Sequence, residues 1–153
     1  MRAVIQRVKG AKVEVEGKTV GEIGKGLLVL AAVEKGDGER EMEFLARKVA
    51  ELRIFEDEEG RMNLSLLETG GEILLISQFT LAARIKKGRR PSFSKAEEPE
   101  RAKKMLEGVA ERWRKMGIKV EEGVFGARMQ VSLLNYGPVT IILDRQYGGE
   151  NDR

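Results

Sequence analysis

The sequence predicts a single α+β domain, with a mostly antiparallel or mixed sheet rolled toward a barrel and two main helices packed on it. Three observations support this fold class. The chain has 153 residues, a length typical of one domain that buries roughly 68–70% of its unfolded surface. About seven short segments have strand patterns, whereas about two have the helical repeat of apolar residues. Most of the strand segments are separated by short turns, which favours hairpins over repeated strand–helix–strand units.

Three strand-like segments open the chain. Residues 1–8 alternate weakly between apolar and polar and are expected to form a strand. Residues 12–16 and 19–23 flank the turn Gly17-Lys18, so they predict a β-hairpin. Residues 27–33 are apolar on both faces, which is typical of a central buried strand.

A helix is expected next. Met42, Leu45, Val49 and Leu52 recur at steps of three and four, which places them on one apolar face. Asp37 is positioned to cap the helix at its N-terminal end.

A second buried strand and a second helix follow. Residues 72–76 are apolar on both faces and lead directly into Ser77. Ser94 and Glu97 have the spacing of a capping box, and Pro99 fits the first helical turn. The core-facing residues expected on this helix are Ala102, Met105 or Leu106, Val109, Trp113 and Met116.

The last elements are expected to be strands. Gly117 is expected to end the second helix. Residues 119–121 predict a short strand, and residues 129–134 and 139–143 predict two longer strands joined through residues 135–138.

The chain is expected to be one soluble unit. Residues 1–145 form the predicted domain, and the polar, Gly-rich residues 146–153 are expected to fray. No apolar run approaches the ~20 residues of a membrane span, and the N-terminal residues do not resemble a signal peptide. The expected location is therefore the cytoplasm, with no membrane partner.

Composition restricts the chemistry. The chain has no His and no Cys, so it lacks imidazole, thiolate and the commonest metal ligands. We therefore expect no metal site and no cofactor. The reaction should be one for which positioning and backbone hydrogen bonds suffice.

The first candidate site is Ser77-Gln78-Phe79-Thr80, which follows a buried strand. If the strand continues, Gln78 and Thr80 share one face while Ser77 and Phe79 share the other. Unpaired backbone N–H groups at such a strand end can form an oxyanion hole. Thr80 has no His to activate it, which makes it a better binding group than nucleophile. On the local pattern alone, a polar strand end without function is favoured.

The second candidate is the motif that begins at Asn135 and contains Gly137-Pro138. A cis bond before Pro138 would point two successive carbonyls the same way and create a rigid backbone edge. Gly137 has no Cβ, so a ligand could approach that edge closely. On the local pattern alone, an ordinary turn is again favoured.

The third candidate is a cluster of cations. The chain has 28 Lys and Arg against 25 Asp and Glu, a net charge of only +3. Five cations nevertheless gather without an anion in residues 84–90, next to the first motif: Arg84, Lys86, Lys87, Arg89 and Arg90. Such a cluster indicates a polyanionic ligand, whereas charge alone favours a solvated loop.

Taken together, these blocks closely resemble the D-aminoacyl-tRNA deacylase family in its bacterial-type form. The resemblance covers nearly the whole chain, from Met1 to about Asp144, and the blocks occur in the family order. They are residues 1–8, 52–57, 62–65, 77–81, 87–93, 125–127, 129–131 and 135–140. The main departure is in residues 82–85, where the family often has a Tyr and more polar residues.

The resemblance implies hydrolysis of the ester that joins a D-amino acid to the 3′-terminal adenosine of tRNA. It also implies removal of glycine mischarged onto the alanine tRNA. The partners implied are aminoacyl-tRNA and a second copy of the chain, in a homodimer with sites at the subunit interface. Gly137-Pro138 would be cis and would reach from one subunit into the pocket of the other.

The resemblance also assigns roles to residues. The carbonyls of Gly137 and Pro138 would capture the substrate amino group and reject an L-side chain by clash, with Arg7 fixing their orientation. Phe79 and Thr80 would supply backbone N–H groups near the scissile carbonyl. Pocket residues would be Phe125 and Met129. Two catalytic routes stay open on the sequence, Thr80 as nucleophile or assistance by the tRNA 2′-hydroxyl, and the absence of a visible base favours the second. Residues 84–90 would contact tRNA phosphates.

Two other functions stay open on the sequence. A non-catalytic tRNA- or RNA-binding module could use the cationic cluster, although the 5% aromatic content disfavours a stacking surface. A general esterase or peptidase is disfavoured because the chain has no Ser-His or Cys-His pair.

Overall fold

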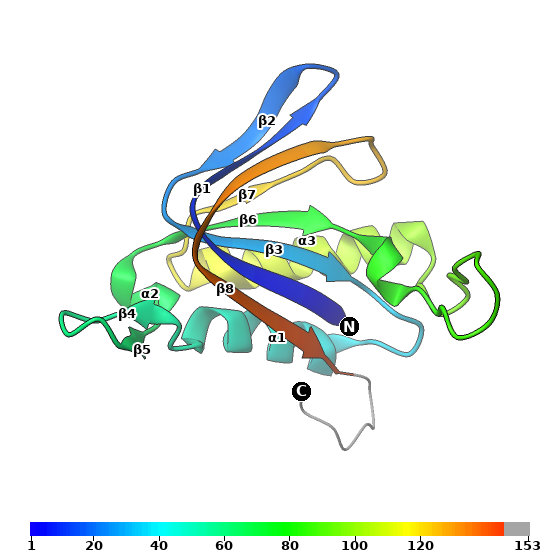
Figure 1. Cartoon of the computed structure of the whole chain (residues 1–153). Coiled ribbons are helices and arrows are strands. Elements are labelled where there is room, and N and C mark those ends of the chain that lie inside the picture. The colour runs from blue at the N-terminus through cyan, green and yellow to red at the C-terminus, as the bar shows by residue number, and fades with distance from the viewer. Residues whose placement is uncertain (146–153) are drawn as a thin grey trace.

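The computed structural model of the chain describes residues 1–145. The predicted fraying of residues 146–153 falls outside these described residues. Within them the chain forms one α+β unit, in which a strongly curved mixed sheet is covered by helices on one face (Figure 1). The predicted fold class is confirmed.

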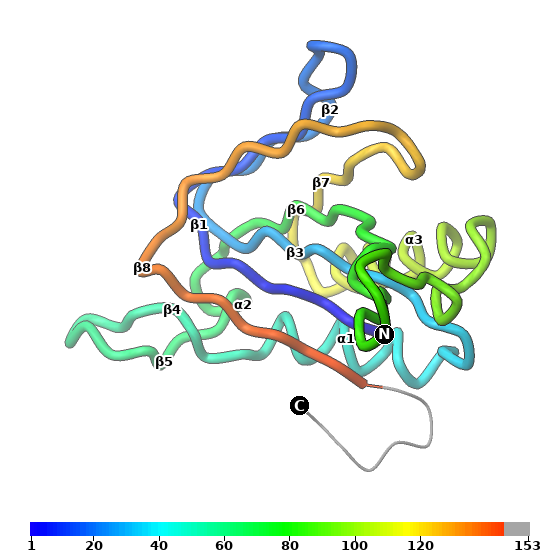
Figure 2. The backbone as a smooth tube through the Cα atoms, turned by 45° about the vertical axis from the view of Figure 1, so that its right-hand side comes forward, coloured from blue at the N-terminus to red at the C-terminus, as the bar shows by residue number. Residues whose placement is uncertain are grey.

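The main sheet has six strands. Five of them follow the order β2-β1-β3-β6-β7, and the sixth, β8, pairs with β1 along the edge that β2 and β3 leave free. Their bounds are β1 (Arg2–Val15), β2 (Lys18–Ile23), β3 (Gly26–Ala32), β6 (Glu72–Ser77), β7 (Val120–Glu122) and β8 (Gln130–Asp144). β1 pairs antiparallel with β2, β3 and β8, whereas β3–β6 and β6–β7 are parallel. Figure 2 shows β8 following β1 as both curve, so the sheet nearly closes.

Two long helices cover one face of the sheet: α1 (Glu39–Glu51) and α3 (Pro99–Lys115). They pack together through Trp113, which is fully buried and donates its indole N–H to the Ala46 carbonyl at 2.8 Å. The smaller elements are β4 (Phe55–Glu56), β5 (Met62–Leu64), α2 (Leu66–Thr69) and the 3₁₀ turn η1 (Phe79–Ala82).

The apolar residues on the two faces of β3 and β6 pack into two different hydrophobic clusters. Leu27, Val29 and Ile73 contribute to the core beneath the helices. Leu28 and Leu74 point the other way, into a second cluster enclosed by the curved sheet. The prediction that these strands are buried on both faces is therefore confirmed, and it follows from a sheet that rolls over itself.

Several strand boundaries differ from expectation. Residues 1–8 and 12–16, expected as two strands, belong to the single strand β1. The expected break near Gly10 is only a shift of register against β8. Two crossovers through helices, from β3 to β6 and from β6 to β7, make those pairs parallel, so hairpins are less dominant than expected.

Both helix starts also differ from expectation. Gly38 occupies the N-cap of α1, because the Asp37 carboxylate instead accepts the N–H of Glu34 at 2.7 Å. Glu98 caps α3, accepting the N–H of Arg101 at 2.7 Å, so the predicted Ser94–Glu97 box does not form.

The C-terminal end of α3 contains one error in the predicted core. Met116 is 38% exposed rather than buried, because it is the C-cap residue beyond the last helical turn. The other core positions predicted on α3, Ala102 to Trp113, are buried.

The largest difference concerns residues 129–143. The two expected strands are one strand, β8, and both of its halves pair antiparallel with β1. Between them the register jumps: Gln6 pairs with Thr140 and Val8 with Asn135, so four residues of β8 lie opposite Arg7 alone. Residues 136–139 therefore form a bulge in a continuous strand and not a turn between hairpin strands.

Candidate active site

The first motif lies where β6 ends. Ser77 pairs with Ala31 of β3, and the N–H of Gln78 donates to the Ala31 carbonyl at 2.8 Å. The chain then turns into η1, so the strand does not continue through residues 78–80 and the alternation of faces that depended on it does not arise. Because of this turn, Gln78 and Thr80 meet directly, and Gln78 Nε2 donates to Thr80 Oγ1 at 2.5 Å.

The turn leaves backbone donors at its start. The N–H of Leu81 donates to the Gln78 carbonyl and the N–H of Ala83 to the Thr80 carbonyl, each at 3.1 Å. The N–H groups of Phe79 and Thr80 precede the first of these bonds and have no partner within the turn. Both residues are exposed, and backbone N–H groups left without a partner are the kind of donor from which an oxyanion hole is built.

A cavity of about 250 Å³ opens beside this turn. Ser77, Phe79 and Phe125 line it, and most of its remaining lining is apolar, from β3 and the start of α3. Phe79 is 56% exposed and contacts Phe93 edge to face, with ring centroids 5.2 Å apart. Ser77, Phe79 and Phe125, named from the sequence, are thus brought together at one cavity.

The ionisable side chain of Glu97, which lines the cavity, is poorly suited to act as a general base. The backbone N–H of Glu98 that donates to its carboxylate holds its pKa below the ordinary value. A carboxylate with a lowered pKa is a weak general base. Among residues 1–145, no group of three or more acidic side chains is placed to hold a metal ion.

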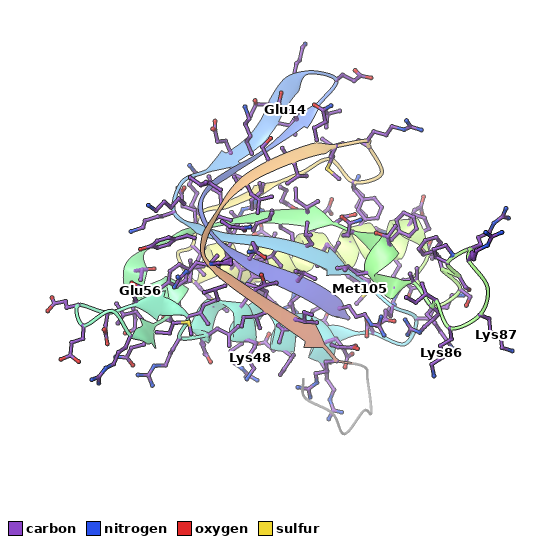
Figure 3. All side chains as sticks on the ribbon, in the orientation of Figure 1. Glu14, Lys48, Glu56, Lys86, Lys87 and Met105 are labelled. Carbon is purple, nitrogen blue, oxygen red and sulfur yellow. The ribbon has the colours of Figure 1, made fainter. Side chains whose placement is uncertain are left out.

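The cationic loop, residues 84–90, lies next to η1. Figure 3 shows Lys86 and Lys87 extending outward from it, away from the sheet. Lys86, Lys87, Arg89 and Arg90 are exposed, as expected of phosphate-binding side chains. Arg84 differs from the other four because its guanidinium is paired with the buried Glu34 at 2.9 Å.

The second motif forms the bulge of β8 opposite Arg7. The Gly137–Pro138 peptide bond is cis, and both residues are exposed. Arg7 is only 2% exposed; its Nε donates to the Tyr136 carbonyl at 2.8 Å and its Nη1 to the Ile54 carbonyl at 2.7 Å. Its guanidinium also lies over the Tyr136 ring, 4.7 Å from the centroid. Arg7 thus fixes the backbone immediately before Gly137.

The two motifs are far apart within one chain. The bulge lies opposite Arg7, which pairs with Leu27, and Leu27 pairs with Ile73, four residues before Ser77. The separation is therefore about 13 Å along the strands and about 14 Å across three strand spacings. Figure 1 shows the bend of β8 and the turn after β6 at opposite ends of the sheet.

Met129 and Asn135 lie at different places. Met129 packs against the second hydrophobic cluster and onto Gly123, near the end of β6 that carries Ser77. Asn135 is exposed on β8 beside the bulge, in register with Val8. Met129 thus belongs to the side of the first motif and Asn135 to the side of the second.

Sequence reasoning missed a buried group of charges beneath the first motif. Glu34 is fully buried two residues after the end of β3, and Arg2 and Arg84 lie against it. Asp37 is nearby; burial raises the pKa of its carboxyl above the ordinary 3.8, although an ion pair with the Met1 ammonium opposes this. The only signal for Glu34 was its position at the end of an apolar run.

Comparison with known proteins identifies the family to which the chain is similar. A family model described as D-Tyr-tRNA(Tyr) deacylase matches residues 4–144. A D-aminoacyl-tRNA deacylase of Thermosipho africanus is 58% identical over 144 residues, which are 94% of this chain and 97% of the relative. A D-aminoacyl-tRNA deacylase of Aquifex aeolicus is 57% identical with the same coverage of 94% and 97%.

Solved structures share the fold. One named c-Myc DNA Unwinding Element Binding Protein superimposes with a TM-score of 0.89 at 40% identity, covering 95% of this chain and 99% of its own. A eukaryotic protein described as a probable D-amino acid tRNA deacylase gives a TM-score of 0.81 at 19% identity, with 94% and 98% covered, which shows the fold alone. Because the family model spans residues 4–144 and curated deacylases are 57–58% identical over almost the whole chain, this chain belongs to the D-aminoacyl-tRNA deacylase family of ester hydrolases.

Proposed function

We propose that this chain hydrolyses the ester between a D-amino acid and the 3′-terminal adenosine of tRNA, at the cavity beside Ser77-Gln78-Phe79-Thr80. The observation that carries the proposal is the 3₁₀ turn η1, which leaves the backbone N–H groups of Phe79 and Thr80 without a partner in the turn, with Phe79 also lining the cavity. By donating hydrogen bonds, these two N–H groups would stabilise the negative charge that develops on the ester carbonyl oxygen.

Catalysis needs little else, because an aminoacyl ester is already activated. Removing one oxyanion donor from a hydrolase costs about 2.7–4 kcal/mol of transition-state stabilisation, so two such donors can supply much of the rate. Neither His nor Cys is present, and the pKa of Glu97 is lowered. The 2′-hydroxyl of the terminal ribose, beside the scissile bond, then assists, and the Thr80 hydroxyl only binds Gln78.

The chirality filter is the Gly137-Pro138 edge of a second subunit. Within one chain this edge is too far from Ser77 to reach the cavity, so it must act on a neighbouring copy if it acts on substrate at all. It is exposed, and Arg7 binds the Tyr136 carbonyl immediately before it. The strand that carries it presents apolar side chains to solvent, with Leu134 62% and Ile142 67% exposed, as a homodimer interface would require.

Selection by this edge works through exclusion. The carbonyls of Gly137 and Pro138 bind the substrate amino group, an L-side chain is then directed into backbone, and a D-side chain points away. Glycine has no side chain to exclude, so glycine mischarged on the alanine tRNA is also a substrate.

The tRNA is held by the cationic loop. Lys86, Lys87, Arg89 and Arg90 are exposed on the loop that follows η1, where they can neutralise phosphates of the acceptor end. The site of action is the cytoplasm, where aminoacyl-tRNA is used. None of the helices in residues 1–145 has the length and apolar character needed to span a bilayer.

A second candidate is a nucleic-acid-binding module without catalysis. The exposed cations of the loop favour it, and one solved relative is named for binding a DNA unwinding element. Such a module would bind tRNA and release no amino acid.

The deciding experiment measures amino acid released from matched D- and L-tyrosyl-tRNA by the purified protein. Fast release from the D-form alone supports the proposal. Release from neither, with tRNA still bound, would favour the binding module. Equal release from both would retain the hydrolase and reject the filter.

A further inference from the structure

We propose that Glu34 and Arg84 are positioning residues that hold the catalytic turn η1, and that Arg84 is set apart from the phosphate-binding cations of its own loop. This inference rests on the deacylase activity proposed above. It assigns a role to a buried charge that the catalytic scheme does not otherwise use.

Glu34 is an unusual residue to find in a core. Its side chain is fully buried, and burying an unpaired carboxylate is very costly. Arg84 Nη2 donates to its Oε2 at 2.9 Å. Arg2 Nε lies 3.5 Å from its Oε1, close enough for an ion pair. Two guanidinium groups therefore converge on one carboxylate.

The same two arginines also hold the last carbonyls of η1. Arg84 Nη1 donates to the Ala82 carbonyl at 3.0 Å, and Arg2 Nη1 donates to the Leu81 carbonyl at 3.1 Å. η1 has only four residues, so its carbonyl end cannot shift without moving the N–H groups of Phe79 and Thr80. Glu34 thereby orients both arginines, and the arginines fix the proposed oxyanion hole.

Arg84 also fixes the base of the cationic loop. Its N–H donates to the Ser92 carbonyl at 2.8 Å and its carbonyl accepts the N–H of Ser92 at 2.9 Å. This pair of hydrogen bonds closes the loop between Arg84 and Ser92 at its base. The other four cations of the cluster lie within the loop and take no part in the bridge. Because the Arg84 side chain is bonded to Glu34 and Ala82, its donors are directed inward, away from a phosphate.

The test compares Arg84→Met with Arg89→Met, using Arg47→Met on the exposed face of α1 as a neutral control. Each is assayed on D-tyrosyl-tRNA and on D-tyrosyl-adenosine, a small substrate without phosphates. A misplacement of about 1 Å costs roughly a hundredfold in rate, so Arg84→Met should lower kcat by at least about tenfold on both substrates. Its KM for the tRNA substrate should stay within about twofold of wild type, because phosphate contacts dominate the affinity for tRNA and Arg84 makes none in this proposal.

Arg89→Met supplies the opposite pattern. Removing one phosphate contact raises KM for tRNA and lowers the slope of log affinity against log salt by about 0.7–0.9. If Arg84→Met behaves this way with kcat intact, Arg84 binds phosphate and the inference is overturned. If wild type releases no D-tyrosine from either substrate, the proposed function itself fails, which is a separate outcome.

Arg84→Met removes one partner of the buried Glu34 carboxylate and can unfold the protein, because an uncompensated buried charge is strongly destabilising. The double variant Glu34→Gln/Arg84→Met removes both charges and should restore the melting temperature. It should still show the tenfold loss in kcat, because the Ala82 carbonyl has lost its donor. A folded double variant with wild-type kcat on the small substrate would refute the positioning role.

Discussion

Replacing Gly137 with alanine tests the proposed chirality filter directly. Gly137 has a φ of +129°, a conformation that costs an L-residue about 1–3 kcal/mol. An added Cβ would also lie 2.8 Å from Arg7 Nη2 and 3.0 Å from Val139 Cγ2. Arg7 cannot yield freely, because its Nη1 and Nε are bonded to the Ile54 and Tyr136 carbonyls.

The alanine is therefore accommodated by moving either the Gly-Pro edge or Arg7. Loss of one hydrogen bond from a charged group costs about 1.5–3 kcal/mol. Together with the backbone cost, this should lower the free energy of unfolding by about 3–6 kcal/mol. An edge displaced by about 1 Å should lower kcat/KM for D-tyrosyl-tRNA roughly a hundredfold.

The assay is release of tyrosine from D- and L-tyrosyl-tRNA, with unfolding followed by urea titration. Gly17→Ala is the matched control: Gly17 has a φ of +78° at the β1–β2 turn, and its Cβ would meet no atom within 4 Å. It should lose about 1–2 kcal/mol of stability from the backbone alone and keep its activity. Wild-type kcat/KM in Gly137→Ala, with L-tyrosyl-tRNA still rejected, would refute the reasoning.

Four further predictions follow from the same geometry. Thr80→Val should retain most of the kcat for D-tyrosyl-tRNA, because the hydroxyl is not the nucleophile; a loss near a thousandfold in single-turnover assays would contradict RNA-assisted catalysis. Replacing Lys87 and Arg89 with Ala together should raise KM for tRNA and reduce the salt slope by about 1.5; an unchanged slope in binding titrations would remove the loop from the tRNA interface. Leu134→Asp should dissociate the proposed dimer and abolish activity together, since it places a charge in an apolar interface; light scattering that shows an active monomer would disprove the shared site. Burial raises the pKa of Asp37 above 3.8, so the folded state holds that proton more tightly than the unfolded chain, and the contribution of Asp37 to stability falls as pH rises through the raised pKa; urea titrations at several pH values between about 3 and 7 should show Asp37→Asn gaining stability relative to wild type as pH rises, and the opposite trend would contradict the assigned shift.

Local patterns predicted the elements whose burial is decided by their own residues. β3 and β6 were predicted because they are apolar on both faces, and α3 because its apolar residues recur at helical spacing. Ser77 was correctly placed at the end of a buried strand. These features depend on composition over a few residues, which the sequence displays directly.

Features set by distant partners were not predictable in the same way. Residues 135–138 look like a turn, but both flanking segments pair with β1, about 130 residues earlier, and this pairing makes them a bulge. Gln78 and Thr80 were assigned to one strand face because nothing local revealed the 3₁₀ turn. Arg84 looked like its neighbours until Glu34, fifty residues away, was seen to hold it.

The pairing of β8 with β1 also affects the order in which the strands of the sheet can pair during folding. Hydrogen bonds between these strands join residues 129 and 134 positions apart, and contacts of such long range form slowly because a large loop must close first. A ribosome-bound chain can assemble β1, β2, β3 and α1 early, but the outer edge of β1 stays unpaired until β8 emerges. That edge is a template for association with other chains. We therefore expect the strand that carries Gly137-Pro138 also to protect the nascent protein from aggregation.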